Sequence, residues 1–326
     1  MIFVFDLEGP LSPMDHAAEA MRIIGNKLGR PDFFNLFQMV SLYDDELTLE
    51  GKPGYNPGDT LRLIAPIVST QLSDEELVEI SDEAALTPGA KDLMATLDMD
   101  DVYVASTSYQ QHAYTVAEKL GIDLQHVNCT LLPKYKDFPY LEGLLDIFQK
   151  YKKSDMQTVK RDLDALFWGE MDYDYLKTKV CGGQRKLDVV EQISQERDVA
   201  ASDFIAVGDS ITDINMLSGV KKAGGIAVSF NGNQYSVPKA NLAISSLSLM
   251  ALRPIVDEHP DVWAFVKEWN YVQDKLKLLE PETKAYFEQH GLKPSYDEVR
   301  QSELDGIVAR QKEMRVAIRK EYSELT

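Results

Sequence analysis

The stretch that decides the fold is MIFVFDLEG, residues 1–9 of the 326-residue chain. Ile2 to Phe5 are continuously apolar and β-prone, which predicts a short strand buried on both faces, as in a parallel sheet. Asp6 and Glu8 follow at once, and Gly9 permits a sharp turn away from the sheet. Because open α/β sheets bind ligands at the carboxyl ends of their strands, both acids are candidate site residues. A solvated acidic turn is the alternative that this stretch alone leaves open.

Two later strands also end in polar residues. Val102 to Ala105 is followed by Ser106, and Phe204 to Val207 is followed by Asp209 and Asp213. Predicted helices separate these strands, which indicates a parallel sheet whose carboxyl ends converge on one crevice. Two weaker strands are predicted at 226–228 and 242–244.

The sequence predicts an α/β fold with a Rossmann-like doubly wound parallel sheet, a helical cap, a second helical insertion and a helical C-terminal extension. Helical spacing of apolar residues and helix-start signals dominate the segments outside the sheet, with Ser73 and Glu76 forming a capping box. The predicted boundaries are 1–12, 87–132 and 180–250 for the core, 13–86 for the cap, 133–179 for the second insertion and 251–326 for the extension.

A long final helix is predicted to start at Pro294-Ser295 with Glu298. One stripe of this helix is apolar, and it is expected to pack against the protein's own domain; a partner subunit is the alternative, as a homo-oligomer or another protein. The stripe consists of Leu304, Ile307, Met314, Ile318, Tyr322 and Leu325.

Composition narrows the class of protein. Lys+Arg 34 against Asp+Glu 53 gives a net charge of -19, which disfavours nucleic acid and anionic membranes as partners. Two cysteines, Cys129 and Cys181, are too few for a disulfide framework, so a reducing compartment is expected. The apolar start breaks at Asp6 without a basic lead-in, so no signal peptide is expected, and no later run is long enough to cross a bilayer. We therefore expect a cytoplasmic protein.

The carboxylates at the strand ends require a compensating cation. Asp6, Glu8, Asp209 and Asp213 would repel one another in one crevice. Mg²⁺ prefers oxygen ligands and is usually held by one or two carboxylates together with a substrate phosphate. The pattern therefore predicts a magnesium site and a phosphorylated ligand.

The chain resembles the haloacid dehalogenase-like superfamily, chiefly its phosphatases of the phosphoserine-phosphatase-like branch. The family's Asp-x-Asp or Asp-x-Glu motif is matched by Asp6-Leu7-Glu8, and its strand-end Ser or Thr by Ser106. Its helix-start lysine is matched by Lys186, and its Gly-Asp-x-x-x-Asp motif by Gly208 to Asp213, in the family's order. The Asp-Leu-Glu-Gly stretch is also similar to that of a phosphoserine:homoserine phosphotransferase. These motifs cover the core sheet, and not the insertions or the extension.

The resemblance implies a role for each matched residue. Asp6 would be the nucleophile that forms an aspartyl phosphate, and Glu8 the acid and then the base. The remaining roles are phosphate binding and metal binding. Phosphate would be held by Ser106, Thr107 and Lys186, and the metal site would involve Asp6, Glu8, Asp209 and Asp213.

Some of these residues have alternative roles or competitors. Ser106 could cap the following helix, with Thr107 or Ser108 in its role, and Asp213 could be the N-cap of the segment that starts at Ile214. Lys186 competes with three other basic residues in the same region, namely Arg185, Lys177 and Lys179.

The sequence is compatible with three functions. The first is a Mg²⁺-dependent phosphatase that hydrolyses a small phosphorylated metabolite through an aspartyl phosphate. Glu8 favours phosphoester chemistry because it supplies the acid that an alcohol leaving group needs. The second is a phosphotransferase that moves the phosphoryl group to an acceptor hydroxyl. The third is a subunit that uses a phosphatase-like fold for binding.

Overall fold

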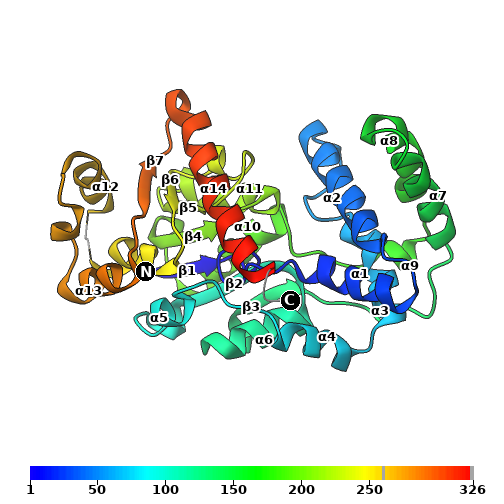
Figure 1. The fold of residues 1–326 in the computed structure, drawn as a ribbon, viewed down its shortest axis with the longest axis horizontal. Helices are drawn as coiled ribbons and strands as arrows, with labels where there is room; N and C mark the ends of the chain where they lie inside the picture. The colour runs from blue at the N-terminus through cyan, green and yellow to red at the C-terminus, as the bar shows by residue number, and fades with distance from the viewer. Residues whose placement is uncertain (259–260, 324–326) are drawn as a thin grey trace.

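The computed structural model describes residues 1–258 and 261–323 and is built around one seven-stranded sheet (Figure 1). The strand order is β3-β2-β1-β4-β5-β6-β7, with β7 antiparallel to β6 and the other pairs parallel. The strands are β1 (Ile2–Phe5), β2 (Val102–Tyr109), β3 (Val127–Thr130), β4 (Phe204–Gly208), β5 (Ile226–Phe230), β6 (Leu242–Ser245) and β7 (Ser295–Glu298). The predicted doubly wound α/β fold is therefore confirmed.

The first strand lies at the centre of the sheet and is buried on both faces. Phe5 is in register with Val104 of β2 and Val207 of β4, so the carboxyl ends of the three strands lie side by side. Alternate residues of β1 face opposite layers: Phe3 and Phe5 belong to one apolar core, and Ile2 and Val4 to another.

Helices cover both faces of the sheet. The core that contains Phe5 includes residues of α5 (Ala90–Met94), α6 (Gln110–Leu120), α12 (Val262–Tyr271) and α13 (Pro281–His290). The core that contains Val4 includes residues of α10 (Gln184–Arg197) and α11 (Ile214–Lys222). Burial on both faces explains why these strands read as continuous apolar runs.

The two segments predicted as separate helical insertions share one hydrophobic core. The first comprises α1 (His16–Lys27), α2 (Phe33–Glu50), α3 (Leu61–Gln71) and α4 (Asp74–Asp82); the second comprises α7 (Leu141–Tyr151), α8 (Met156–Asp164) and α9 (Tyr173–Leu176). Tyr43 of α2 packs edge-on against Phe167, which follows α8, and its hydroxyl donates to Asp164 over 2.7 Å. Figure 1 shows these helices gathered beside the sheet.

Local signals set most helix ends. The capping box of Ser73 and Glu76 is present at the start of α4. Helix α2 continues to Glu50 because Tyr43 and Leu47 extend its buried face, and it ends at Gly51 in the left-handed conformation. None of the helices in the described part of the chain is both long and apolar enough to span a bilayer.

The predicted start of the last helix is wrong. Residues 295–298 form β7, which pairs with β6, and the helix α14 runs over Leu304–Ser323. Tyr296 explains the difference, because it is fully buried and packs edge-on against Phe265 and Trp269. This aromatic contact brings the segment to the sheet edge, which the local capping signal could not indicate.

The apolar stripe of α14 packs on the chain's own sheet where it is described. Ile307 is fully buried with Val237 and Ala243, and Ile318 is also buried. Leu304 and Met314 are half-buried. Of the other predicted stripe residues, the Tyr322 side chain and Leu325 lie outside the described residues.

A buried histidine pair joins the helical part to the core. His16 of α1 stacks on His112 of α6 with ring centroids 4.7 Å apart. Burial lowers the pKa of His16 to about 4 and holds the pKa of His112 well below its ordinary value. Both rings are therefore neutral in the folded state at pH 5, whereas an unfolded chain protonates them below a pKa of about 6.5.

This pair is expected to make the folded state less stable in acid. Between pH 7 and pH 5 the unfolded state takes up protons that the folded histidines do not, so the stability contributed by each ring falls as pH falls. From pH 7 to pH 5, we expect the free energy of unfolding of the native chain to fall by about 2 kcal/mol more than that of the His112→Phe variant. Urea unfolding of both proteins at pH 7 and pH 5 measures these free energies. If the native chain and the variant lost the same free energy of unfolding between the two pH values, a neutral buried His112 would be ruled out.

Candidate active site

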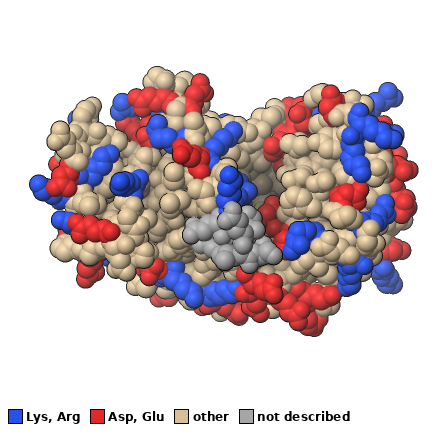
Figure 2. Space-filling model, viewed as in Figure 1, with Lys and Arg blue, Asp and Glu red and all other residues tan. Residues whose placement is uncertain are grey.

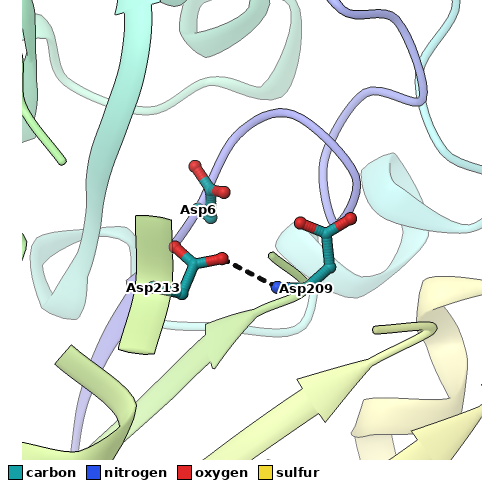
Figure 3. A group of neighbouring side chains, drawn as sticks. All are labelled: Asp6, Asp209 and Asp213. Atoms are coloured by element: carbon teal, nitrogen blue, oxygen red, sulfur yellow. Dashed lines mark hydrogen bonds between the residues drawn. The ribbon is translucent and has the colours of Figure 1, made fainter. Parts of the chain in front are cut away.

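The predicted site residues converge where β1, β2 and β4 end. Asp6 follows β1, and Asp209 and Asp213 follow β4; oxygen atoms of these three carboxylates lie within 4.8 Å of one another (Figure 3). All three are buried. The register of the parallel strands produces this cluster from residues more than two hundred positions apart.

Asp6 is held in a fixed position. Its backbone N-H donates to the Val207 carbonyl over 2.8 Å, and its Oδ1 accepts the Leu7 N-H over 2.7 Å. Burial raises the pKa of Asp6, the nearby charge of Asp213 raises it further, and Lys186 opposes both. A cation beside Asp6 is therefore needed to keep it ionised.

Lys186 supplies one such cation. Its Nζ lies 2.8 Å from Asp6 Oδ1 and 2.7 Å from Asp213 Oδ1, and the side chain is fully buried. Burial alone would lower the pKa of this lysine, but the charges of Asp213 and Asp6 raise it. Lys186 is therefore charged and bridges two carboxylates.

The other basic candidates lie elsewhere. Arg185 pairs with Asp59 of the helical part over 2.6 Å. Lys177 pairs with Asp174 over 3.5 Å, and Lys179 is exposed. Of the four residues weighed from the sequence, Lys186 is the one that contacts Asp6.

Asp213 orients the loop after β4. Its Oδ2 accepts the Asp209 N-H over 2.9 Å, drawn as a dashed line in Figure 3, and the Ser210 N-H over 3.0 Å. Its Oδ1 is used by Lys186. Both oxygens of Asp213 therefore have protein partners. It is the N-cap residue of α11, as the alternative reading expected, but its side chain makes no capping hydrogen bond to that helix.

Asp209 retains an oxygen without a partner. Its Oδ1 is buried and makes no hydrogen bond in the described part of the chain, whereas its Oδ2 pairs with Arg315. Gly9 lies against the Asp209 carboxylate, and a larger residue would clash there, because a Cβ at Gly9 would lie 2.3 Å from Asp209 Oδ2. Gly9 also has φ +111°, which L-residues rarely adopt. An orphaned carboxylate oxygen beside other carboxylates is suited to a hard divalent cation.

Glu8 lies outside the three-carboxylate cluster, in a polar corner of the same pocket. Its Oε1 accepts hydrogen bonds from the Ser108 hydroxyl and, over 3.0 Å, from the His16 N-H. Burial, followed by the charge of Asp15, raises the pKa of Glu8 to about 8. Its carboxyl group is therefore mostly protonated near pH 7, which suits a proton donor.

The hydroxyl residues of β2 divide between the interior and the pocket. Ser106 is fully buried, and its Oγ accepts the Ser108 N-H over 3.1 Å. Thr107 and Ser108 line the pocket. The three residues belong to the irregular end of β2, which runs on to Tyr109 rather than ending at Ala105 as predicted. Tyr109 also lines the pocket, and its buried hydroxyl has no partner in the described residues.

The pocket has a volume of about 290 Å³ and lies between the sheet and the helical part. Phe37 and Ile64 of the helical part line one wall. Arg315 and Arg319 of α14 also line it, and the sequence analysis missed both. Their spacing of four residues on one helix was the available signal, but nothing in the sequence placed α14 beside the strand ends.

The chain has the fold of solved phosphoserine phosphatases, as its resemblance to the haloacid dehalogenase-like superfamily predicted. It is similar to gene product AF1437 from Archaeoglobus fulgidus, with 25% identity and a TM-score of 0.75 over 98% of this chain and 96% of that one. It is also similar to a phosphoserine phosphatase solved as a phospho-aspartyl intermediate analogue, with 18% identity and a TM-score of 0.53 over 78% of this chain and 98% of that one.

A substrate-bound phosphoserine phosphatase complex gives a similar match, with 16% identity and a TM-score of 0.52 over 78% of this chain and 98% of that one. No family model matches the sequence, and no curated protein does. At these identities the phosphoserine phosphatases establish the fold alone.

Proposed function

We propose that this chain is a Mg²⁺-dependent phosphatase that hydrolyses a small phosphorylated metabolite through an aspartyl phosphate on Asp6. The observation that carries the proposal is the buried contact of Lys186 with Asp6 and Asp213, with Asp6 and Glu8 lining the same pocket. Asp6 and Glu8 face one pocket and Lys186 contacts Asp6 from the buried side, which suits a nucleophile, a proton donor and a fixed cation. One phosphoserine phosphatase with this fold was solved as a phospho-aspartyl intermediate analogue, which is the type of intermediate proposed here for Asp6.

Asp6 and Asp209 would hold the metal, and Asp213 would orient Asp209 through its backbone N-H. When bound, Mg²⁺ would neutralise charge on the phosphoryl oxygens and keep Asp6 ionised. Lys186 adds a second positive charge at the same carboxylate. A phosphate dianion can therefore approach Asp6 despite the surrounding acids.

The reaction would have two displacements. In the first, an Asp6 carboxylate oxygen bonds to phosphorus while the bond from phosphorus to the alcohol oxygen breaks, and Glu8 donates its proton to that oxygen. In the second, Glu8 takes a proton from water, the water oxygen bonds to phosphorus, and the acyl-phosphate bond breaks. Inorganic phosphate leaves, Asp6 is a carboxylate again and Glu8 is again protonated.

A direct assay tests the proposal. With p-nitrophenyl phosphate as substrate, we expect p-nitrophenol release that requires added Mg²⁺ and stops when EDTA is in excess. Equal rates with and without the metal would contradict the metal-dependent mechanism. If an amino-alcohol acceptor took up the phosphoryl group in place of water, the activity would be phosphotransfer, and the longer acid at Glu8 would then serve an acceptor hydroxyl.

A further inference from the structure

The C-terminal helix contributes two cations to the pocket. Arg315 and Arg319 lie one turn apart on α14 and both line the cavity that contains Asp6 and Glu8. Figure 2 shows the surface hollowed between the sheet-bearing part and the helical part of the molecule. Arg319 also lines an adjoining groove of about 790 Å³, whose walls come mainly from α1, α2 and α7. It therefore lies where the inner pocket opens into the groove.

The two arginines have different surroundings. Arg315 is engaged by Asp209: its Nη1 donates to the Asp209 carboxylate and, over 3.1 Å, to the Asp209 carbonyl. It therefore acts as a positioning residue for that carboxylate. Arg319, in contrast, is exposed and makes no hydrogen bond or ion pair with any residue in the described part of the chain.

Neighbouring acids do not neutralise Arg319 by direct contact. Asp15, which lines the same pocket, caps α1 by accepting the Ala18 N-H over 3.0 Å. The Asp44 carboxylate, which also lines the pocket, accepts the Gly58 N-H over 2.9 Å and the Thr60 hydroxyl over 3.0 Å. The donors of Arg319 are thus available to a molecule in the pocket.

We propose that Arg319 binds a second anionic group of the substrate, separate from the phosphoryl group that Asp6 accepts. A guanidinium presents a planar fork of N-H donors that matches a carboxylate or a phosphate in a bidentate contact. The substrate class is then a phosphate monoester that carries a further carboxylate or phosphate at its other end. This inference rests on the proposed phosphatase function and assigns specificity to the C-terminal extension rather than to the helical cap.

Three esters test the proposal with the full-length chain and Mg²⁺. Glycerol 3-phosphate and 3-phosphoglycerate differ only in a hydroxymethyl group against a carboxylate, and 1,3-propanediol bisphosphate carries a second phosphate. We expect kcat/KM to be higher for at least one anionic ester than for glycerol 3-phosphate. In Arg319→Met, the ratio of kcat/KM for that anionic ester to kcat/KM for glycerol 3-phosphate should fall at least about tenfold. Arg319→Lys should restore part of this ratio.

Arg310→Met is the matched control, because Arg310 lies on the same helix but pairs with Asp297 over 2.8 Å at the surface. The Arg310→Met variant should keep the native ratio of kcat/KM between the anionic ester and glycerol 3-phosphate. Calorimetric binding of the same esters to the Asp6→Asn variant, with and without Arg319→Met, separates recognition from turnover. The anionic ester should bind at least about tenfold more weakly when Arg319 is replaced.

The outcomes distinguish this inference from the proposed function. If Arg319→Met loses the native preference for only one of the two anionic esters, the proposal is supported. That ester then identifies the group that Arg319 binds as a carboxylate or a phosphate. An unchanged ratio in Arg319→Met overturns it, even if all esters are hydrolysed. If the native chain hydrolyses no ester, the proposed function fails, and the binding measurement still decides whether Arg319 recognises an anion.

Discussion

Replacing Asp6 by asparagine is expected to lower the rate of p-nitrophenyl phosphate hydrolysis by at least about 10⁴-fold, as is typical when a covalent nucleophile is removed. Asparagine keeps the size of the side chain and can still accept the Leu7 N-H, but its amide does not form a phosphoryl intermediate. Steady-state kinetics at saturating Mg²⁺ measure the loss.

Two controls keep this result interpretable. Far-UV circular dichroism should show that Asp6→Asn is folded, and Asp98→Asn, an acid near the start of β2 that caps a short turn, should keep native activity. Activity in Asp6→Asn within about tenfold of native would contradict the assignment of Asp6 as the nucleophile.

Replacing Lys186 by methionine is expected to lower the free energy of unfolding by about 3 to 5 kcal/mol, the usual cost of removing one partner from a buried ion pair. Lys186 is fully buried and contacts two carboxylates, so its loss leaves Asp6 and Asp213 facing each other without the shared cation. Urea unfolding at pH 7 in the absence of divalent metal measures the change.

The matched control is Lys179→Met, an exposed lysine nearby, for which we expect a change within about 0.5 kcal/mol. The double variant Lys186→Met with Asp213→Asn should recover part of the lost stability, because one of the two uncompensated charges is then absent. A loss below about 1 kcal/mol in Lys186→Met would mean that the bridge seen between these side chains contributes little.

The sequence was sufficient for the central strands and for most of the acidic site. Ile2 to Phe5 and Phe204 to Val207 are continuous apolar runs, and such runs identify strands buried on both faces without tertiary information. Once these strands are parallel and adjacent, the positions of Asp6 and Asp209 follow, since both come directly after their strands.

Features that depend on packing between distant segments were not predictable. Tyr296 brings residues 295–298 into the sheet through contacts with Phe265 and Trp269, although the local pattern favoured a helix start. Arg315 reaches Asp209 only because α14 docks beside the strand ends. Both outcomes are decided by long-range contacts that outweigh local propensity.

The most direct test of the central claim is a crystal structure of the chain grown with Mg²⁺ and beryllofluoride, a mimic of the aspartyl phosphate. We expect beryllium bonded to an Asp6 carboxylate oxygen, Mg²⁺ contacted by Asp6 and Asp209, and Lys186 still beside Asp6. An adduct on another carboxylate, or Mg²⁺ bound without Asp209 while Asp6 remains unmodified, would contradict it.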